Sequence, residues 1–453
     1  AKIFLGGIMC VVCFTVVGTI AVGAQLSPMP ASEVPQPPER SFSSSQFPVN
    51  EAASLFSSHG NPLTSVKNLL SSNISDPVDQ CRIQEVSKAR NFTWAGFPDK
   101  TPMTQRSGVV KWALIPVDFA DVPGERKFKP RVTKQMKLLS EWFRTVSNGN
   151  LKVEWVVSDK WVRIPGKSTD YAIARSLNLG DSPNGEKLFK AAMDSADPVF
   201  DFTNIQTVNF ILPKGQKFIT EGTQGFPWDR AVKEYSTKEG KISSYSMPGE
   251  FFDLPGKTYW SYWAHEFGHA IGIPHVGSSR GTLPPFNPWD LMGGQDGPAR
   301  ELSGWLRFLA GWMPDSQIYC KQANKIENLR LTLEPLSGTG KGLKLAIIPV
   351  SKTKAVLIES RRETKFSCKT TPGRNGVLVY VYDATLGHGE DFLIAASPPG
   401  RPNQTDSCNS QNFRSTSPNP DVLLRSGDKV SIEGLQVEVV KIGRQDKVLV
   451  SRK

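Results

Sequence analysis

Three of the chain's five histidines lie close together, at positions 265, 269 and 275. They stand in the segment HEFGHAIGIPH, which has the spacing HExxHxxGxxH. Neutral imidazole is a common zinc ligand, and three such ligands leave the fourth tetrahedral position open, as in catalytic rather than structural zinc sites. The spacing therefore predicts one catalytic Zn2+ held by His265, His269 and His275.

A helix is expected to position the first two ligands. The pattern of apolar residues predicts this helix from Thr258 to Ile271. Residues four apart project from the same helix face, so His265 and His269 would point together into a cleft. Gly272 can adopt a positive φ, which would end the helix and turn the chain back to bring His275 to the metal. The opposite face would be anchored in the core by Trp260, Trp263, Phe267, Ala270 and Ile271.

Glu266 follows the first ligand and is the candidate catalytic residue. Its carboxylate would take a proton from a water molecule that zinc activates, and would return the proton to the leaving amine of a cleaved peptide bond. Three alternatives stay open. The protein could be a surface or adhesion protein that keeps a zinc-bound fold and binds through its β domain, or a metal-dependent hydrolase of another bond. The histidines could also be plain surface residues beside a solvated glutamate.

The extended histidine motif resembles that of the metzincin clan of zinc endopeptidases. The clan has a methionine-containing turn beneath the zinc, and Met292, in the segment WDLMGG (289–294), stands at a suitable distance downstream. No tyrosine closely follows Met292, so the extra tyrosine ligand of the astacin-like and serralysin-like groups is not available in this sequence. The resemblance implies a metzincin-like zinc protease domain with Met292 in its Met-turn.

Five further segments carry a narrower resemblance: VDFAD (117–121), SNGNL (147–151), SGWLRFLAGW (303–312), IESR (358–361) and GVLVY (376–380). Through them the chain is most similar, within the clan, to the immune-inhibitor-A-type family of secreted bacterial metalloproteases, from about residue 105 to the C-terminus. Some members of that family place Asp where this chain has His275. The family often binds calcium, for which Asp118 and Asp121 are the candidates here, with capping of a turn as the alternative.

The same resemblance suggests how a substrate would be held. In metzincins an edge strand of the sheet binds the substrate as an added antiparallel strand. Lys241–Met247 (KISSYSM) lies shortly before the predicted zinc helix and is the candidate strand. An ordinary surface loop is the alternative.

The order of apolar segments predicts an α/β (α+β) catalytic domain, residues 105–322, followed by an all-β, sandwich-like domain, residues 323–453. Residues 25–104 would form a Ser/Pro-rich spacer and an N-terminal segment that is either a propeptide or a clasp. In the catalytic domain, strands are expected at 109–119, 151–157, 161–164 and 207–212, and helices at 132–146 and 186–193. The strands 151–157 and 161–164 are expected to pair with each other.

Residues 1–24 have the pattern of a secretory signal peptide. Lys2 precedes an apolar run from Ile3 to Val22, and Val22-Gly23-Ala24 resembles a signal-peptidase site. An uncleaved membrane anchor is the alternative, because about twenty apolar residues also span a bilayer. Either interpretation predicts that the rest of the chain is secreted, or attached to the cell surface.

Composition narrows the class of protein further. With 453 residues, 39% of them hydrophobic, and one long apolar run, the chain is expected to be globular, and a polytopic membrane protein is excluded. The formal charge of +11 comes from scattered lysines and arginines, so no nucleic-acid partner is expected. Protein or peptide substrates are the expected partners.

Four cysteines follow the predicted signal peptide, and an even number in an exported chain predicts two disulfides. Cys368 and Cys408 both fall in the predicted β domain and are expected to pair. Cys81 would then pair with Cys320 and clasp the N-terminal segment to the junction of the two domains. The alternative is that the Cys81 thiolate caps the zinc in a latent form.

Overall fold

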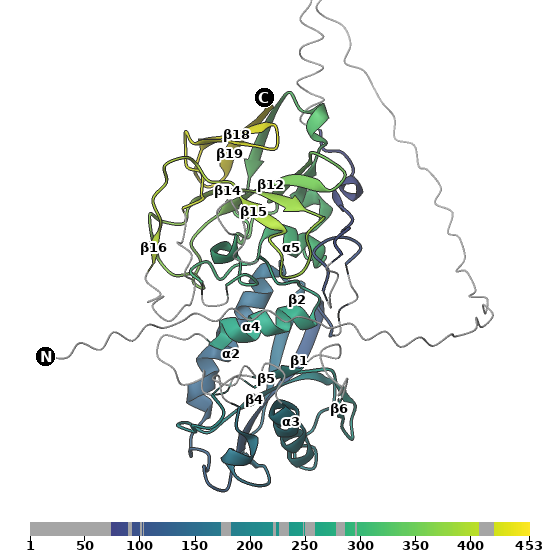
Figure 1. Cartoon of the computed structure of the whole chain (residues 1–453), viewed down its shortest axis with the longest axis vertical. Helices are drawn as coiled ribbons and strands as arrows, with labels where there is room; N and C mark the ends of the chain where they lie inside the picture. Colours follow the sequence, from purple (N-terminus) through teal and green to yellow (C-terminus); the bar gives the residue numbers. More distant parts are fainter. Residues whose placement is uncertain are drawn as a thin grey trace, which may run out of the picture. The chain divides into compact units, whose positions relative to one another are not determined.

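The computed structural model describes residues 74–88, 93–99, 102, 104–173, 183–220, 223–225, 235–247, 249, 259–277, 286–294, 297–406 and 421–453 (Figure 1). All of them lie in one compact unit, Asn61–Lys453. Within these ranges, no helix is both long and apolar enough to cross a bilayer. The predicted signal peptide, residues 1–24, lies outside the described residues, so its cleavage stays a prediction.

A mostly parallel sheet forms the first half of the fold. Its strands are β1 (Gly108–Asp118), β2 (Leu151–Val157), β3 (Val162–Arg163), β4 (Ile205–Ile211), β5 (Thr223–Gly225) and β8 (Ser244–Met247). They follow the order β2-β1-β4-β8-β5, in which β5 alone runs antiparallel to its neighbour. A separate two-stranded sheet joins β6 (Tyr235–Ser236) and β7 (Lys241–Ile242).

The prediction that segments 151–157 and 161–164 pair with each other is wrong. Both β2 and β3 instead pair in parallel with β1. β1 is long enough to hold two partners on one side, because its residues from Gly108 to Leu114 pair with β2 and its last two pair with β3. Apolar patterning indicates where strands lie, but it does not specify their partners.

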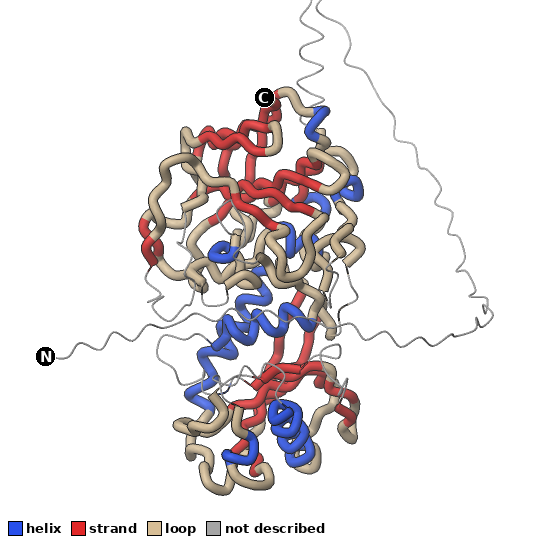
Figure 2. The backbone as a smooth tube through the Cα atoms, viewed as in Figure 1, coloured by secondary structure: helices blue, strands red, loops and turns tan. Residues whose placement is uncertain are grey.

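Three helices cover the two faces of this sheet (Figure 2). α2 (Lys129–Val146) and α4 (Tyr259–Ala270) share a core with one face, and α3 (Pro183–Ala196) packs on the other. Side chains along β1 alternate accordingly: Val110, Trp112 and Leu114 face α2 and α4, whereas Ala113, Ile115 and Val117 face α3. The Trp112 ring lies 4.0 Å from the Phe267 ring of α4, so the sheet directly supports the helix that carries His265 and His269.

Two mainly antiparallel sheets form the second half of the fold. The five-stranded sheet has the order β15-β14-β12-β11-β9, and the four-stranded sheet has the order β10-β19-β18-β17. Their bounds are β9 Ile318–Cys320, β10 Asn328–Leu333, β11 Leu345–Pro349, β12 Lys354–Arg361, β14 Gly376–Asp383, β15 Leu393–Ala395, β17 Lys429–Ile432, β18 Leu435–Lys441 and β19 Asp446–Arg452. The short strands β13 (Thr370–Thr371) and β16 (Thr405–Asp406) pair beside them.

The two sheets pack face to face, as a sandwich does, but they are not independent of the first half. Along β12 and β14, Val356, Ile358, Val377, Val379 and Val381 face the four-stranded sheet. The alternate residues Leu357, Leu378 and Tyr380 belong instead to the core that contains α4 and α5 (Gly304–Leu309). A separate all-β C-terminal domain is therefore not confirmed. The five-stranded sheet is buried on both faces, and one of its strands, β9, lies before the predicted domain boundary at residue 322.

The N-terminal segment 74–99 is attached to this second half. A disulfide joins Cys81, in the short 3-10 helix Val78–Cys81, to Cys320 of β9, with a Cα–Cα distance of 5.9 Å. The Trp305 indole donates a hydrogen bond of 2.8 Å to the Ala95 carbonyl. The pair Cys81–Cys320 is thus the one expected from the sequence, and Cys81 is not a free thiolate. Cys368 is also disulfide-bonded, while Cys408, its predicted partner, lies outside the described residues.

A buried ionic network links the two halves. Arg361 donates to Glu359 (2.5 Å), to Glu301 (3.2 Å) and to the Trp289 carbonyl (3.1 Å). Arg307 of α5 donates to the other oxygen of Glu301 at 2.9 Å. Burial acts to raise the pKa of Glu301, but Arg361 and Arg307 hold that pKa below its usual value. All four side chains are buried, so each depends on its partners to offset desolvation.

Removal of the Arg361 side chain should therefore destabilise the folded protein. Arg361→Ala leaves Glu359 and Glu301 buried without their shared cation, and it should lower the free energy of unfolding by about 3–5 kcal/mol. Urea denaturation measures the change. Lys447→Ala, at an exposed position of β19, is the control and should change stability by less than about 0.5 kcal/mol. Equal effects of the two substitutions would contradict the role of the network.

Candidate metal centre

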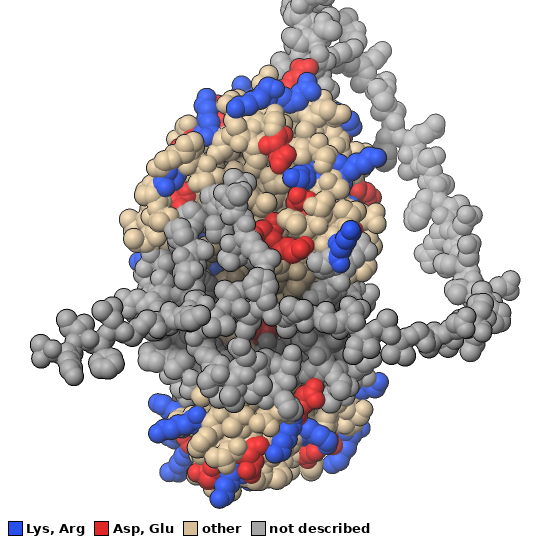
Figure 3. All heavy atoms as spheres, in the orientation of Figure 1, with Lys and Arg blue, Asp and Glu red and all other residues tan. Residues whose placement is uncertain are grey.

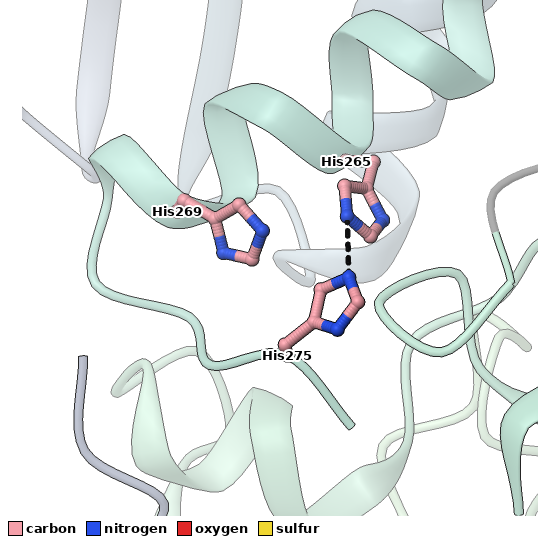
Figure 4. Close-up of side chains that lie close together, drawn as sticks. All are labelled: His265, His269 and His275. Carbon is pink, nitrogen blue, oxygen red and sulfur yellow. Dashed lines mark hydrogen bonds between the residues drawn. The ribbon is translucent and has the colours of Figure 1, made fainter. Parts of the chain in front are cut away.

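The structure brings His265, His269 and His275 together (Figure 4). Two of the rings come from α4, and the third approaches from the chain after the helix. One ligand nitrogen of each histidine lies within 4.8 Å of the others, and the Nε2 atoms of His265 and His275 are 3.1 Å apart. Within the described residues, this is the one cluster of three or more His, Cys, Asp or Glu side chains with such spacing.

The end of α4 sets the path to the third ligand. Gly272 has φ +90, a left-handed conformation that side chains rarely tolerate. Its N–H donates to the His269 carbonyl (2.9 Å), and the N–H of Ile273 donates to the Gly268 carbonyl (2.8 Å). These two bonds form a Schellman motif, which ends the helix and reverses the chain. The helix-ending role that the sequence predicts for Gly272 agrees with this geometry.

The outer ring nitrogens of the two helical histidines are already used. His265 Nδ1 donates to the Leu291 carbonyl at 2.9 Å, and His269 Nδ1 donates to the Ile273 carbonyl at 3.0 Å. A neutral imidazole that donates through Nδ1 keeps a lone pair on Nε2. Metal-binding histidines commonly have such a bond, which fixes the tautomer and the ring orientation. The donor set therefore fits a zinc ion.

Burial keeps the three imidazoles neutral. Burial, followed by the neighbouring His275, lowers the pKa of His265 to about 3. Burial also lowers the pKa of His269 well below its usual value, and it lowers the pKa of His275. A histidine must lose its proton to bind a metal, so these shifts favour the binding form at neutral pH.

Glu266 lies beside the cluster without belonging to it. It follows His265 in α4, and 7% of its surface is exposed. Its carboxylate oxygens are not among the mutually close ligand atoms, which come from the three histidines only. This position suits a base next to a metal better than a fourth ligand.

Met292 lies directly against the zinc-motif helix. It is fully buried, and a Cβ placed on Gly268 of α4 would lie 2.6 Å from the Met292 sulfur. Asp290 shapes the turn, because its carboxylate accepts from the N–H groups of Met292 (2.8 Å) and Ser303 (2.7 Å). Burial raises the pKa of Asp290 to about 6. The same turn contains Leu291, whose carbonyl accepts the hydrogen bond that orients the His265 ring.

His388 is a neighbour of the site that the sequence does not reveal. It stands in a loop-like stretch of the sequence, and the structure places its ring centroid 5.6 Å from that of His269 and 5.8 Å from that of His275. Burial, followed by His275, lowers its pKa to about 4. A single histidine more than one hundred residues from the motif gives no spacing signal.

Calcium at Asp118 and Asp121 is not supported. The Asp118 carboxylate accepts two hydrogen bonds from Arg163 (2.6 and 3.0 Å) and one from the Gly124 N–H (2.7 Å). Asp121 accepts from the N–H and hydroxyl of Ser168, which are 2.8 and 2.7 Å away, and the backbone bond lowers its pKa. Both carboxylates hold turns, which is the alternative that the sequence left open.

The segment Lys241–Met247 is not an edge strand. It divides into β7 and β8, and β8 lies between β4 and β5. The main chain of β8 is therefore paired on both sides, β7 pairs with β6 in the separate two-stranded sheet, and the antiparallel strand β5 occupies the edge of the main sheet instead.

Comparisons with known proteins give weak likenesses. No family model matches the chain, and no curated protein matches it. Among similar solved structures, metalloproteinase-II from Bacteroides fragilis is 17% identical over 49% of this chain, with a TM-score of 0.26. The match spans 58% of that protein's length. At a score this low, the likeness supports no conclusion about activity.

Two further solved structures show the same level of likeness. Archaemetzincin from Methanopyrus kandleri is 13% identical, covering 45% of this chain and 93% of that one, with a TM-score of 0.24. OgpA from Akkermansia muciniphila, in a catalytically inactive form with an O-glycopeptide substrate, is 10% identical, covering 80% and 99%, with a TM-score of 0.28. The function must therefore be inferred from the geometry of the site itself.

The close approach of Met292 to Gly268 can be tested. Gly268→Ala should lower the free energy of unfolding by about 1 kcal/mol net, because overpacking costs about 1–3 kcal/mol and alanine restores up to about 1 kcal/mol of helix propensity. Adding Met292→Ala should give a loss smaller than the sum of the two single losses, since the shorter side chain removes the overlap. Urea unfolding of the four proteins measures this coupling, and simple additivity would show that residue 268 does not press on Met292.

Proposed function

We propose that the chain is a zinc-dependent endopeptidase of the metzincin clan, similar to the immune-inhibitor-A-type metalloproteases. The observation that carries the proposal is the set of three neutral imidazoles beside Glu266, two of them buried and that of His275 half-buried. The two ordered Nδ1 bonds add to it, because a plain structural histidine does not need its Nε2 lone pair turned toward two others. Met292 against α4 also agrees with the Met-turn of the clan.

The residues divide into two roles, metal ligand and general base. His265, His269 and His275 would hold one Zn2+ and leave a position open. Zinc, when bound, would polarise the scissile carbonyl and lower the pKa of a water molecule. Glu266 would accept the proton of the attacking water and pass it to the leaving amine, which a carboxylate next to the site can do without binding the metal.

A peptide substrate would bind along the edge of the first sheet. β5 is the antiparallel edge strand, and its neighbour β8 contacts α4. An extended peptide paired with β5 would gain main-chain hydrogen bonds and would present its side chains alternately to pockets. In this proposal β5 takes the role that the sequence suggested for Lys241–Met247.

The protein would act outside the cytoplasm. Disulfide-bonded Cys81, Cys320 and Cys368 support this location, because disulfides persist mainly in oxidising compartments. Removal of residues 1–24 as a signal peptide would agree with it. Anchoring at the cell surface is the outcome if those residues are retained.

The mechanism predicts that metal binding and catalysis separate at one position. Glu266→Gln should keep one zinc per chain but lose about 10²-fold or more in kcat, the range of general acid–base catalysis. His265→Ala, His269→Ala and His275→Ala should each lose zinc and activity together. Zinc content by elemental analysis and cleavage of casein, with and without a zinc chelator, measure these outcomes.

A matched control accompanies these variants. Glu327→Gln makes the same substitution at an exposed position far along the chain and should leave both zinc content and cleavage unchanged. Stoichiometric zinc without chelator-sensitive cleavage would favour an adhesion protein that keeps the zinc-bound fold. Wild-type cleavage by the Glu266→Gln variant would show that the proposed base is wrong.

A further inference from the structure

The third histidine lacks the support that a helix gives to the other two. His265 and His269 have their backbones fixed within α4, but His275 follows the helix in an irregular stretch of chain. A ligand on such a stretch needs contacts from elsewhere to hold its position, because metal affinity depends on how well the ligands are placed before the metal binds.

Those contacts come from the loop between β14 and β15 in the five-stranded sheet. The backbone N–H of His275 donates to His388 Nδ1 at 3.1 Å. The N–H of Gly389 donates to the His275 carbonyl at 3.0 Å, and the N–H of Gly277 donates to the Glu390 carbonyl at 3.1 Å. Both main-chain groups of the third ligand are thus bonded by two adjacent residues of this loop.

The orientation of the His388 ring is fixed in turn. A backbone N–H can only donate, so His388 Nδ1 must carry a lone pair, and the neutral ring then holds its proton on Nε2. The hydroxyl of Thr93, a fully buried residue of the N-terminal segment, lies 2.6 Å from the same Nδ1. Glu390 also accepts from the Gly387 N–H (2.7 Å), which stabilises the loop around His388.

His388 is close to the metal centre without being one of its ligands. Its ring centroid lies 5.8 Å from that of His275, and its nitrogens are not in the group of mutually close ligand atoms. His388 Nδ1 instead contacts the backbone N–H of His275 and the hydroxyl of Thr93. This arrangement matches the outer partners that orient metal ligands elsewhere.

We propose that His388 is a positioning residue for the metal site, and that with Thr93 it holds His275 where the third nitrogen is needed. The inference rests on the zinc site of the proposed function but not on peptide cleavage. It makes the five-stranded sheet and the N-terminal segment parts of the metal centre, although neither supplies a ligand.

Zinc affinity, measured by competition with a chromophoric chelator, tests the proposal. His388→Ala should weaken zinc binding by about 10- to 100-fold, the usual cost of losing an outer partner. His388→Asn should stay within about threefold of wild type, because its carboxamide oxygen accepts the same N–H. Thr93→Val should weaken binding by less than His388→Ala. Val440→Ala, at an exposed position of β18, is the control and should not change the affinity.

The visible spectrum of the Co2+-substituted protein separates a positioning role from a ligand role. His388→Asn should keep the wild-type band positions, because the three nitrogen ligands are unchanged. The contrary outcome is that His388→Asn shows shifted bands and loses as much affinity as His388→Ala. That result would show that His388 itself binds the metal, and would overturn the proposal. Wild-type affinity in His388→Ala would overturn it as well.

The failure of the proposed function would look different. If the wild-type protein binds no zinc, the metal site itself is wrong, and the positioning role fails with it. If the wild-type protein binds zinc but cleaves no peptide, the affinity series still decides the role of His388. A metal-free unfolding midpoint for each variant confirms that the altered proteins fold, so that a lower affinity reports on the site.

Discussion

The site depends on a limit of helix geometry, which is that one α-helix offers two imidazoles to a metal but not three. Residues four apart share a face, so α4 supplies His265 and His269. The third nitrogen has to come from beyond the helix end, and the chain must reverse within a few residues to deliver it. Gly272 makes this reversal at φ +90, where a side chain would add strain. That turn directs the chain back toward the other two imidazoles, and the β14–β15 loop then bonds the backbone of His275.

Burial of the imidazoles then dictates what surrounds them. A buried polar nitrogen without a partner is costly, so each helical histidine needs a carbonyl on its outer side. Ile273 supplies one from the helix end itself, whereas Leu291 supplies the other from the Met292 turn. That turn is held by Asp290, and the neighbouring Trp289 carbonyl accepts from Arg361 of β12. The buried ionic network and the metal centre are therefore parts of one continuous structure.

The sequence predicted what depends on local spacing. The zinc helix, its ending at Gly272 and the long strand β1 follow from patterns within a dozen residues. It failed where the outcome depends on distant partners: β2 and β3 share β1, and β5 rather than Lys241–Met247 lies at the sheet edge. For Asp118 it left calcium and turn capping open, and the structure shows a carboxylate that accepts hydrogen bonds from the Gly124 N–H and Arg163. The disulfide Cys81–Cys320 also joins distant residues, but it could be predicted because four cysteines allow few possible pairings. No such limit on possible partners applies to His388, so the sequence did not indicate that it lies beside the metal site.

The five-stranded sheet explains why a boundary near residue 322 looks reasonable in the sequence yet does not divide the structure. The predicted sandwich domain includes β12 and β14, but their apolar runs, AVLI (355–358) and VLVYVY (377–382), are continuous, and both faces of each strand are buried. One face belongs to the sandwich, and the other packs on α5 and the core of the zinc helix. Residues 105–322 contain all three clustered histidines, but the groups that bond the backbone of His275 lie beyond that range. The ligands are local in sequence, whereas their placement is a property of the whole described fold.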